Sequence, residues 1–112
     1  MALDGKIAIV TGGAQGIGYA IAKRLLQDNV RVAIADVDER KGQAAEKDLA
    51  TLGDVRFIAT DVGDRLSVHN LMASTLDVFG DIDILVNNAG IQHVAAIEDF
   101  PADTWDRIIA IN

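Results

Sequence analysis

A glycine-rich segment near the N-terminus has the residue types and the spacing of a phosphate-binding turn. It reads Thr-Gly-Gly-Ala-Gln-Gly-Ile-Gly over residues 11–18, so that Gly12, Gly16 and Gly18 follow the pattern Gly-x3-Gly-x-Gly. Residues without a side chain can turn tightly, let a phosphate approach the backbone, and let a helix pack closely against a strand. A helix that begins here offers unpaired N–H groups and a partial positive charge. The segment therefore predicts a site for a pyrophosphate.

An acidic residue follows at a distance suited to binding a ribose. Asp36 stands 18 positions after the last glycine of the turn, and an acid near this distance accepts hydrogen bonds from the hydroxyls of an adenosine ribose. The same carboxylate repels a 2′-phosphate, and neither Gln15 nor Val37 is basic, although Arg40 and Lys41 come later and can reach round. Taken alone, Asp36 is the kind of acid that a solvated loop carries. Beside the glycine turn it favours NAD over NADP as the cofactor.

The elements that must position these residues follow from the spacing of apolar side chains. Four short runs rich in Val and Ile are typical of buried parallel strands: Ile7–Val10, Val30–Ala35, Val55–Ala59 and Ile82–Val86. Three helical stretches lie between them: Gly16–Gln27, Glu39–Leu52 and Asp64–Phe79. This alternation predicts right-handed βαβ units and an α/β fold, a Rossmann-type doubly wound parallel sheet of four strands in the order 3-2-1-4 with flanking helices.

The ends and inner faces of the helices are also predicted. Asp64 is placed to cap the third helix and Gly80 to end it. The inner face of the first helix is predicted to comprise Ile17, Ala20, Ile21, Ala22, Leu25 and Leu26, and that of the second to comprise Ala44, Ala45, Leu49 and Leu52. A last helix is predicted near Asp103–Asn112, just after Pro101, which is the only proline.

Two further motifs stand at strand ends, where ligands bind in sheets of this type. Asp61-Val62 follows the third predicted strand, and Asn87-Asn88-Ala89-Gly90 follows the fourth. The small Ala89 and Gly90 leave room for the nicotinamide ribose, and Asn88 can offer hydrogen bonds to backbone or cofactor. Each motif also has a purely structural explanation, an Asx turn or helix cap for Asp61 and a tight turn for the asparagines.

The glycine turn, Asp36, Asp61-Val62 and Asn87–Gly90, in this order, resemble the cofactor-binding half of the short-chain dehydrogenase/reductase family. The resemblance implies that Asp61 and Val62 lie beside the adenine ring. It also implies that Asn112, after a helix-like Trp105–Ile111, is the catalytic asparagine that holds a water in a proton relay. The cofactor contacts predicted on these grounds are Gly12, Gln15, Gly16, Ile17, Gly18, Asp36, Asp61, Val62, Asn88, Ala89 and Gly90.

The rest of the chemistry implied by the resemblance lies beyond Asn112. The family uses a Ser, a Tyr and a Lys four residues after the Tyr, all downstream of the asparagine, and the Tyr acts as general acid or base. Tyr19 and Lys23 have the Tyr-x3-Lys spacing. Both fall in the first helix, at the wrong end of the cofactor, so we interpret them as surface or packing residues.

The substrate is suggested only by a short stretch after the fourth strand. Residues 91–101, Ile-Gln-His-Val through Ile-Glu-Asp-Phe-Pro, resemble those of bacterial 3-hydroxybutyrate dehydrogenases. In those enzymes the glutamine that matches Gln92 helps to bind the substrate carboxylate, and the alternative is a loop residue of no consequence. Relatives that act on polyols, acetoin or gluconate share the same cofactor half. The predicted function is therefore interconversion of a secondary alcohol and a ketone, with 3-hydroxybutyrate as the first candidate.

Composition excludes several other classes of function. The 112 residues include 17 acidic and 10 basic side chains, for a formal charge of −7, and contain no cysteine. The charge disfavours nucleic acids and anionic membranes as partners, and the lack of cysteine excludes disulfides, zinc–thiolate sites and thiol nucleophiles. No metal is required by the predicted chemistry. A small-molecule substrate, a cytoplasmic location and a homotetramer or homodimer of the full-length protein are expected.

Residues 1–112 are expected to be the N-terminal portion of one dinucleotide-binding domain, incomplete relative to the family. A fourth strand without a downstream neighbour would leave an apolar sheet edge that invites aggregation, so we expect the working protein to continue. Three alternatives stay open: a real fragment that holds only the adenosine and pyrophosphate part of NAD, a non-catalytic module that senses NAD, and a structural fragment that binds nothing.

Overall fold

The computed structural model describes residues 3–88 and 109–111. Its elements are β1 (Ile7–Thr11), α1 (Gly16–Gln27), β2 (Arg31–Asp36), α2 (Glu39–Leu49), β3 (Val55–Ala59), α3 (Arg65–Phe79), β4 (Ile84–Val86) and β5 (Ile109–Ile111). Within the described ranges, no helix has both the length and the apolarity needed to cross a bilayer.

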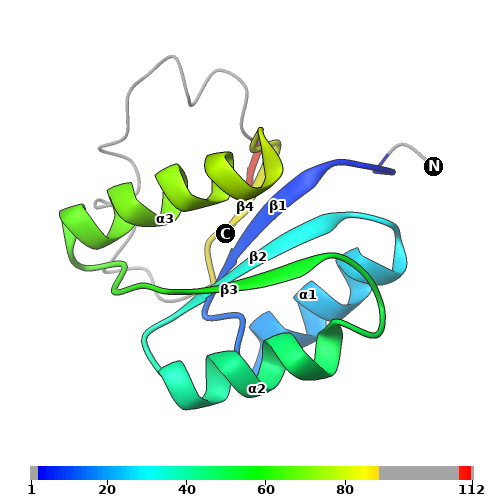
Figure 1. The fold of residues 1–112 in the computed structure, drawn as a ribbon, viewed down its shortest axis with the longest axis horizontal. Helices are drawn as coiled ribbons and strands as arrows, with labels where there is room; N and C mark the ends of the chain where they lie inside the picture. Colours follow the sequence, from blue (N-terminus) through cyan, green and yellow to red (C-terminus); the bar gives the residue numbers. More distant parts are fainter. Residues whose placement is uncertain (1–2, 89–108, 112) are drawn as a thin grey trace.

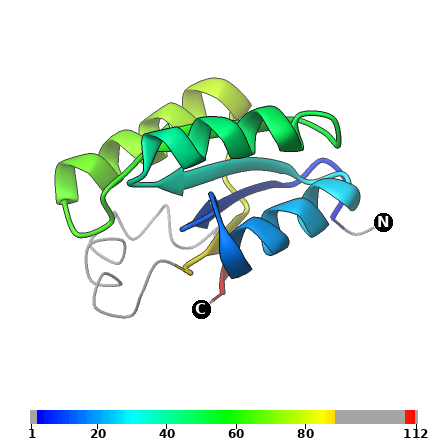
Figure 2. The ribbon, with the colours of Figure 1, turned by 90° about the horizontal axis from the view of Figure 1, so that it is seen from below.

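The strands form one parallel sheet in the order β3-β2-β1-β4-β5, which confirms the predicted order 3-2-1-4 and adds a fifth strand. Helices α1 and α2 cover one face and α3 covers the other (Figure 1). This placement follows from right-handed crossovers that run outward from β1 to β3 and then return across the other face to β4. The arrowheads of β1 and β2 lie at the same end of the sheet (Figure 2), so the carboxyl ends of these strands share one edge.

Successive residues of the strands pack alternately in two separate hydrophobic cores, one on each face of the sheet. In β1 all five residues are buried; Ile7 and Ile9 pack under α3, whereas Ala8 and Val10 pack under α1 and α2. Because adjacent side chains of a strand point to opposite faces, a sheet covered on both sides needs apolar residues at consecutive positions. This is the physical basis of the Val- and Ile-rich runs in the sequence.

The predicted helix ends are confirmed in most cases. Helix α1 has the predicted bounds. Asp64 caps α3 by accepting hydrogen bonds from the backbone N–H groups of Leu66 and Ser67, and Gly80 ends this helix with a φ of 87°. An unpaired N–H near a helix start finds an acceptor in a short acidic side chain, and a left-handed residue after a helix favours glycine.

Helix α2 and the face of α1 depart from the prediction. Helix α2 ends at Leu49 rather than Leu52, and Ala44 and Leu52 are exposed. The buried residues of α2 are Gly42, Ala45 and Leu49. An added Cβ at Gly42 would lie 2.1 Å from the ring of Phe57. Only glycine therefore lets α2 and β3 approach so closely at this position.

In α1 the buried stripe is narrower than predicted. It comprises Gly18, Ala22 and Leu26, which are spaced four residues apart and so lie on one side of the helix. Ala20 is exposed and Ile17 is 72% exposed. The sequence pattern did not distinguish apolar residues that face the sheet from those on the adjoining flank.

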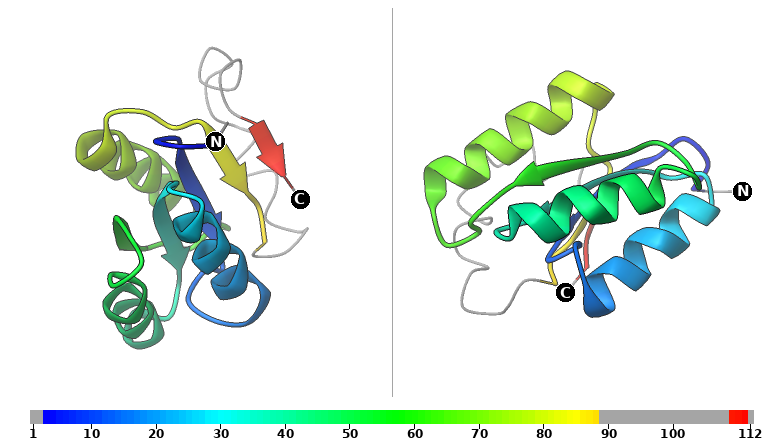
Figure 3. Two further views of the ribbon diagram at one scale, coloured as in Figure 1. Left: turned by 90° about the vertical axis from the view of Figure 1, so that its right-hand side faces the viewer. Right: turned by 60° about the horizontal axis from the view of Figure 1, so that its bottom comes forward.

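The last helix predicted near Asp103–Asn112 is wrong where the structure describes that stretch. Residues Ile109–Ile111 form β5, which pairs in parallel with β4 through Ile84–Ile109, Leu85–Ala110 and Val86–Ile111. The two strands lie side by side in the left view of Figure 3. Two β-branched residues favour a strand, and pairing satisfies backbone groups along the outer edge of β4. Residues 103–108 and 112 lie outside the described residues.

The opposite edge of the sheet, β3, is protected by a side chain. The backbone N–H of Phe57 donates a hydrogen bond to the carboxylate of Glu46 at 2.6 Å. An unpaired N–H on an edge strand can pair with another chain. The carboxylate of Glu46 on α2 accepts the hydrogen bond from this N–H and so blocks such pairing.

Replacing Glu46 with alanine is expected to lower the free energy of unfolding by about 1–2 kcal/mol, because the part-buried N–H loses a charged acceptor. It should also speed aggregation. Glu46→Gln keeps an oxygen acceptor and should lose less. Urea denaturation and light scattering of both variants measure these effects, and equal behaviour of the alanine and glutamine variants would contradict a role for the hydrogen bond.

Candidate functional site

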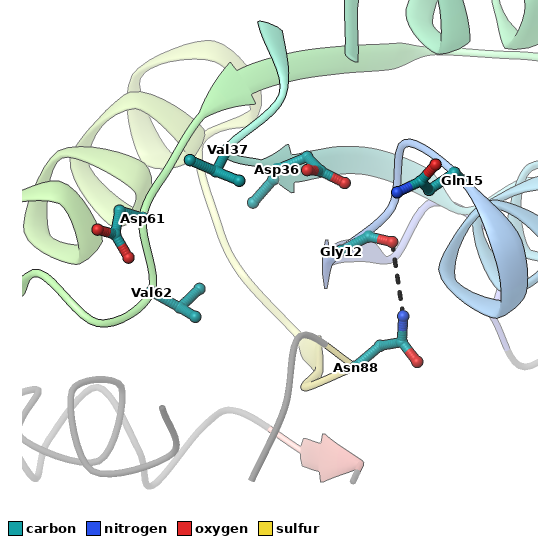
Figure 4. A pocket seen from close by; sticks show the side chains of 8 residues that line it. Gly12, Gln15, Asp36, Val37, Asp61, Val62 and Asn88 are labelled. Atoms are coloured by element: carbon teal, nitrogen blue, oxygen red, sulfur yellow. Dashed lines mark hydrogen bonds between the residues drawn. The ribbon is translucent and has the colours of Figure 1, made fainter. Parts of the chain in front are cut away.

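A cleft of about 330 Å³ opens at the carboxyl ends of the parallel strands. It is lined by Gly12, Gln15, Ala35, Asp36, Val37, Asp61, Val62 and Asn88. Ala35 and Asp36 are the last residues of β2, and the others come from the segments that follow β1, β2, β3 and β4 (Figure 4). Six of the predicted cofactor contacts therefore lie around one cleft, although they are spread over more than half of the chain.

The glycine turn has the geometry that a phosphate requires. Gly12 and Gly16 have φ angles of 65° and 61°, values that side chains other than glycine rarely adopt. An added Cβ at Gly16 would meet nothing within 4 Å, so the space above this residue, at the start of α1, is open to a ligand. The cradle at the N-terminus of α1 fits an anionic group that contacts backbone N–H groups.

Gly18 has a different role within the same turn. An added Cβ here would lie 2.1 Å from the carbonyl oxygen of Gly12 and 2.7 Å from Nδ2 of Asn88. The predicted close packing of the helix is thus directed at the turn itself and at the segment after β4. Gly13 is a residue that the sequence interpretation passed over, and its added Cβ would lie 2.8 Å from Cγ2 of Ile34.

Thr11 joins the glycine turn to the end of β4. It is fully buried, with 0% of its surface exposed. Its hydroxyl lies 3.3 Å from both the carbonyl oxygen of Val86 and Oδ1 of Asn87, and it accepts a hydrogen bond from the N–H of Asn88 at 2.8 Å. Asn88 in turn donates from Nδ2 to the carbonyl of Gly12 at 3.5 Å, the dashed line in Figure 4. The signal for Thr11 in the sequence was a hydroxyl at the end of an otherwise apolar strand.

Asp36 is held by backbone groups rather than free on a solvated loop. Its Oδ2 accepts a hydrogen bond from the N–H of Ala14 at 3.2 Å, and its Oδ1 accepts one from the N–H of Asp38 at 3.1 Å. The carboxylate therefore ties the end of β2 to the glycine turn and points toward that turn in Figure 4. Each carboxylate oxygen has a second acceptor site, so both can still accept hydrogen bonds from ribose hydroxyls.

Asp61 and Val62 serve structural roles at the same place where they line the cleft. Oδ1 of Asp61 accepts a hydrogen bond from the N–H of Gly63 at 2.9 Å, which forms the Asx turn that the sequence also allowed. Val62 is 6% exposed and packs in the core beneath α3. The turn thus presents one polar and one apolar side chain toward the cleft.

Some predicted site residues are not brought to the cleft. Ile17 lines a separate apolar surface of α1 together with Ala20, Ile21, Arg24 and Leu25. Ala89, Gly90, Gln92 and Asn112 lie outside the described residues.

Tyr19 has an environment opposite to that of a catalytic tyrosine. Its hydroxyl donates a hydrogen bond to the carboxylate of Asp48 on α2. This hydrogen bond, with smaller contributions from desolvation and from repulsion by the same carboxylate, raises the pKa of Tyr19 above its usual value. A tyrosine that acts as a base near neutral pH needs a lowered pKa. The interaction instead joins α1 to α2, in agreement with a packing role.

Comparison with known proteins gives consistent matches over nearly the whole chain. A family model described as short chain dehydrogenase matches residues 6–112. An uncharacterized oxidoreductase of Thermotoga maritima is 44% identical over 111 residues, which are 98% of this chain and 43% of that protein. The D-beta-hydroxybutyrate dehydrogenase of Cupriavidus necator is 43% identical over 113 residues, with 98% of this chain and 43% of that protein covered.

Two solved structures share the fold. The complex of Pseudomonas aeruginosa RhlG with NADP superposes with a TM-score of 0.79 and 31% identity, covering 85% of this chain and 44% of that chain. An NAD⁺-bound xylitol dehydrogenase superposes with a TM-score of 0.77 and 30% identity, covering 96% of this chain and 42% of that chain. This chain therefore spans less than half the length of the relatives it matches.

Proposed function

The chain belongs to the short chain dehydrogenase family, and from that premise we propose that the complete protein is an NAD-dependent oxidoreductase that interconverts a secondary alcohol and a ketone. The observation that carries the choice of NAD is the position of Asp36. Its carboxylate accepts from the N–H of Ala14 in the glycine turn and lines the cleft. A negative charge fixed there accepts hydrogen bonds from ribose hydroxyls and repels a 2′-phosphate.

Different residues of this chain are proposed to bind different parts of the dinucleotide. We assign the pyrophosphate to the glycine turn at the start of α1, where Gly16 leaves open space and Gly12 and Gly18 set the shape of the turn and its packing on the helix. We assign the adenosine ribose to Asp36, and the adenine to the cleft wall of Asp61 and Val62. Gln15 and Asn88 complete the rim of the cleft. The nicotinamide, when bound, supplies or accepts the hydride.

The catalytic and substrate residues of the proposal lie outside the described residues. Ala89 and Gly90 are proposed to leave room for the nicotinamide ribose, Asn112 to hold a water in the proton relay, and Gln92 to donate to a substrate carboxylate. The 43% identity to a D-beta-hydroxybutyrate dehydrogenase supports 3-hydroxybutyrate as the first substrate to assay. The Ser, Tyr and Lys of the family's chemistry are assigned to sequence that follows Asn112.

The proposal also covers the cellular location, the oligomeric state and the partners of the enzyme. We place it in the cytoplasm, as a homodimer or homotetramer when full length, acting on a small molecule without a metal ion. The net charge of −7 supports a partner other than nucleic acid or an anionic membrane.

Replacing Asp36 with asparagine in the full-length protein tests the choice of cofactor. NAD should bind about tenfold more weakly, because hydrogen bonds from ribose hydroxyls to a charged acceptor are stronger than those to a neutral amide. NADP should bind more tightly than to the parent protein, since the repulsion is gone. Calorimetric titration with both cofactors measures the two changes. The matched control Asp77→Asn alters an exposed acid on α3 and should change neither affinity. If Asp36→Asn left the ratio of the affinities for NAD and NADP unchanged, the assignment of Asp36 to the adenosine ribose would be contradicted.

A further inference from the structure

We propose that Ser67 on α3 is a positioning residue for recognition of the adenine base, because its hydroxyl holds the backbone of Asp61 at the cleft. The inference rests on the proposed dinucleotide function and deepens it, since it names a residue outside the cleft that sharpens the choice of base. Asp61 and Val62 form the cleft wall that was assigned to the adenine. Ser67 is not one of the described residues that line the cleft, so its effect on the base passes through Asp61.

Asp61 lies just beyond the sheet and is supported by a different element. The hydrogen bond from the N–H of Thr60 to the carbonyl oxygen of Asp36, at 2.9 Å, continues the pairing between β2 and β3 by one residue. The N–H of Asp61 donates instead to the hydroxyl oxygen of Ser67 at 2.9 Å. The position of Asp61 is therefore set by α3 rather than by the neighbouring strand.

A closed ring of hydrogen bonds joins Asp61 to the first turn of α3. The carbonyl oxygen of Asp61 accepts from the N–H of Asp64 at 3.0 Å. The carboxylate of Asp64 accepts from the N–H of Ser67 at 3.4 Å. The hydroxyl of Ser67 closes the ring by accepting from the N–H of Asp61. The N–H and the C=O of Asp61 are both fixed in this way, so the side chain leaves the backbone in a defined direction.

The carboxylate of Asp61 is restrained as well, and it keeps the capacity to bind a ligand. Its Oδ1 accepts from the N–H of Gly63 at 2.9 Å. A carboxylate has about four acceptor sites, so the group can also accept from the exocyclic amino group of a purine. Asp61 is exposed and lies with Val62 on the side of the pocket away from Gln15 in Figure 4. An acceptor fixed there favours a base with an amino group over one with a carbonyl group at the same position.

The contact with Ser67 affects orientation more than stability. The hydrogen bond is exposed to solvent, so water can replace the hydroxyl as acceptor for the N–H of Asp61. Water does not tie this N–H to α3, and the segment between β3 and α3 then has more conformations available. The carboxylate loses its fixed direction, whereas Val62 stays in place because it is buried in the core beneath α3.

The test compares NAD with nicotinamide hypoxanthine dinucleotide, which carries a carbonyl group in place of the adenine amino group. Calorimetric titration of the full-length protein gives the ratio of their Kd values, and the parent protein should prefer NAD. Ser67→Ala should reduce this preference about threefold to tenfold, the range that corresponds to a typical net hydrogen bond. Ser67→Thr keeps the hydroxyl and should retain the preference. If Ser67→Ala weakened the binding of both dinucleotides equally, the proposal would be overturned.

Two further substitutions serve as comparisons. The hydroxyl of Ser74, about two turns further along α3, contacts Oδ1 of Asn70 at 3.5 Å, so Ser74→Ala removes the same group elsewhere on the helix and should leave the ratio unchanged. Asp61→Asn should remove most of the preference for NAD, and adding Ser67→Ala to it should change the ratio no further. Equal effects of Ser67→Ala in the parent and in the Asp61→Asn background would show that Ser67 does not act through Asp61.

The parent protein separates this inference from the proposed function. If it binds neither dinucleotide, the dinucleotide function itself fails. If it binds both with equal affinity, the dinucleotide function stands and the role of Ser67 in the choice of base is overturned. If it prefers NAD and Ser67→Ala leaves that preference unchanged, only the role of Ser67 fails.

Discussion

Replacing Gly18 with alanine is expected to weaken NAD binding about 100-fold, the effect of losing one or two hydrogen bonds between backbone N–H groups and a charged phosphate. The added Cβ would lie 2.1 Å from the carbonyl oxygen of Gly12 and 2.8 Å from its carbonyl carbon. Both are backbone atoms, so no side-chain rotation can relieve the overlap. The turn must move away from α1, and its N–H groups then no longer converge on the pyrophosphate.

The same substitution should lower the free energy of unfolding by about 1–3 kcal/mol, as overpacking of a well-filled interior does. Calorimetric titration with NAD and urea denaturation measure the two effects on the full-length protein. Gly53→Ala is the matched control, because its Cβ would make an ordinary contact of 3.4 Å with Cδ2 of Leu26. If Gly18→Ala behaved like Gly53→Ala, the close approach of helix and turn would be refuted.

Replacing Thr11 with valine is expected to lower the free energy of unfolding by about 2–4 kcal/mol, because valine keeps the volume but leaves two or more polar groups without their partner. The N–H of Asn88 loses its acceptor at 2.8 Å, and the carbonyl of Val86 and Oδ1 of Asn87 lose a hydroxyl at 3.3 Å. Thr11 is fully buried, so water does not readily replace these bonds. NAD binding should also weaken, since Asn88 and the turn are positioned through this hydroxyl.

Thr11→Ser separates the hydroxyl from the rest of the side chain. Serine keeps the donor and acceptor and loses one methyl group, so most of the stability lost in Thr11→Val should return. Urea denaturation of both variants measures the difference. A serine variant as unstable as the valine variant would show that the methyl group, not the hydroxyl, stabilises the junction between β1 and β4.

The fold was predictable from sequence because its signals are local. Consecutive apolar residues in a short run, as in Ile7–Val10, indicate a strand buried on both faces, and that strand is buried throughout. Asp64 and Gly80 mark the ends of α3 through capping chemistry that acts within one turn. In the observed order 3-2-1-4, right-handed βαβ units then place α1 and α2 on one face and α3 on the other.

The departures arise where a distant neighbour decides the outcome. Gly42 is buried because Phe57 packs on it, and no local pattern in α2 shows this. Residues Ile109–Ile111 form a strand beside β4, although they continue a helix-like pattern in the sequence. In both cases contacts with residues far along the chain decide the outcome.

The candidate site shows the same division. Six of the residues that the sequence motifs singled out, Gly12, Gln15, Asp36, Asp61, Val62 and Asn88, line the cleft, whereas Ile17 lies on a separate surface of α1. The hydrogen bonds that orient Asp36 were not predictable, because they come from the backbone of Ala14 and Asp38. The same holds for Thr11, whose hydroxyl accepts from the N–H of Asn88, a residue 77 positions further along the chain.

By itself, the sequence determined the alternation of strands and helices, the position of the glycine turn and the family, because apolar periodicity, capping and glycine spacing are properties of short segments. Only the tertiary structure decided how the site is held together. Thr11 meets Asn88, Gly18 meets Gly12, and Asp36 meets Ala14. These contacts form only when the parallel strands bring their carboxyl ends to one edge, since the hydrogen bonds and close approaches involved reach a few ångströms and carry no signature along the chain.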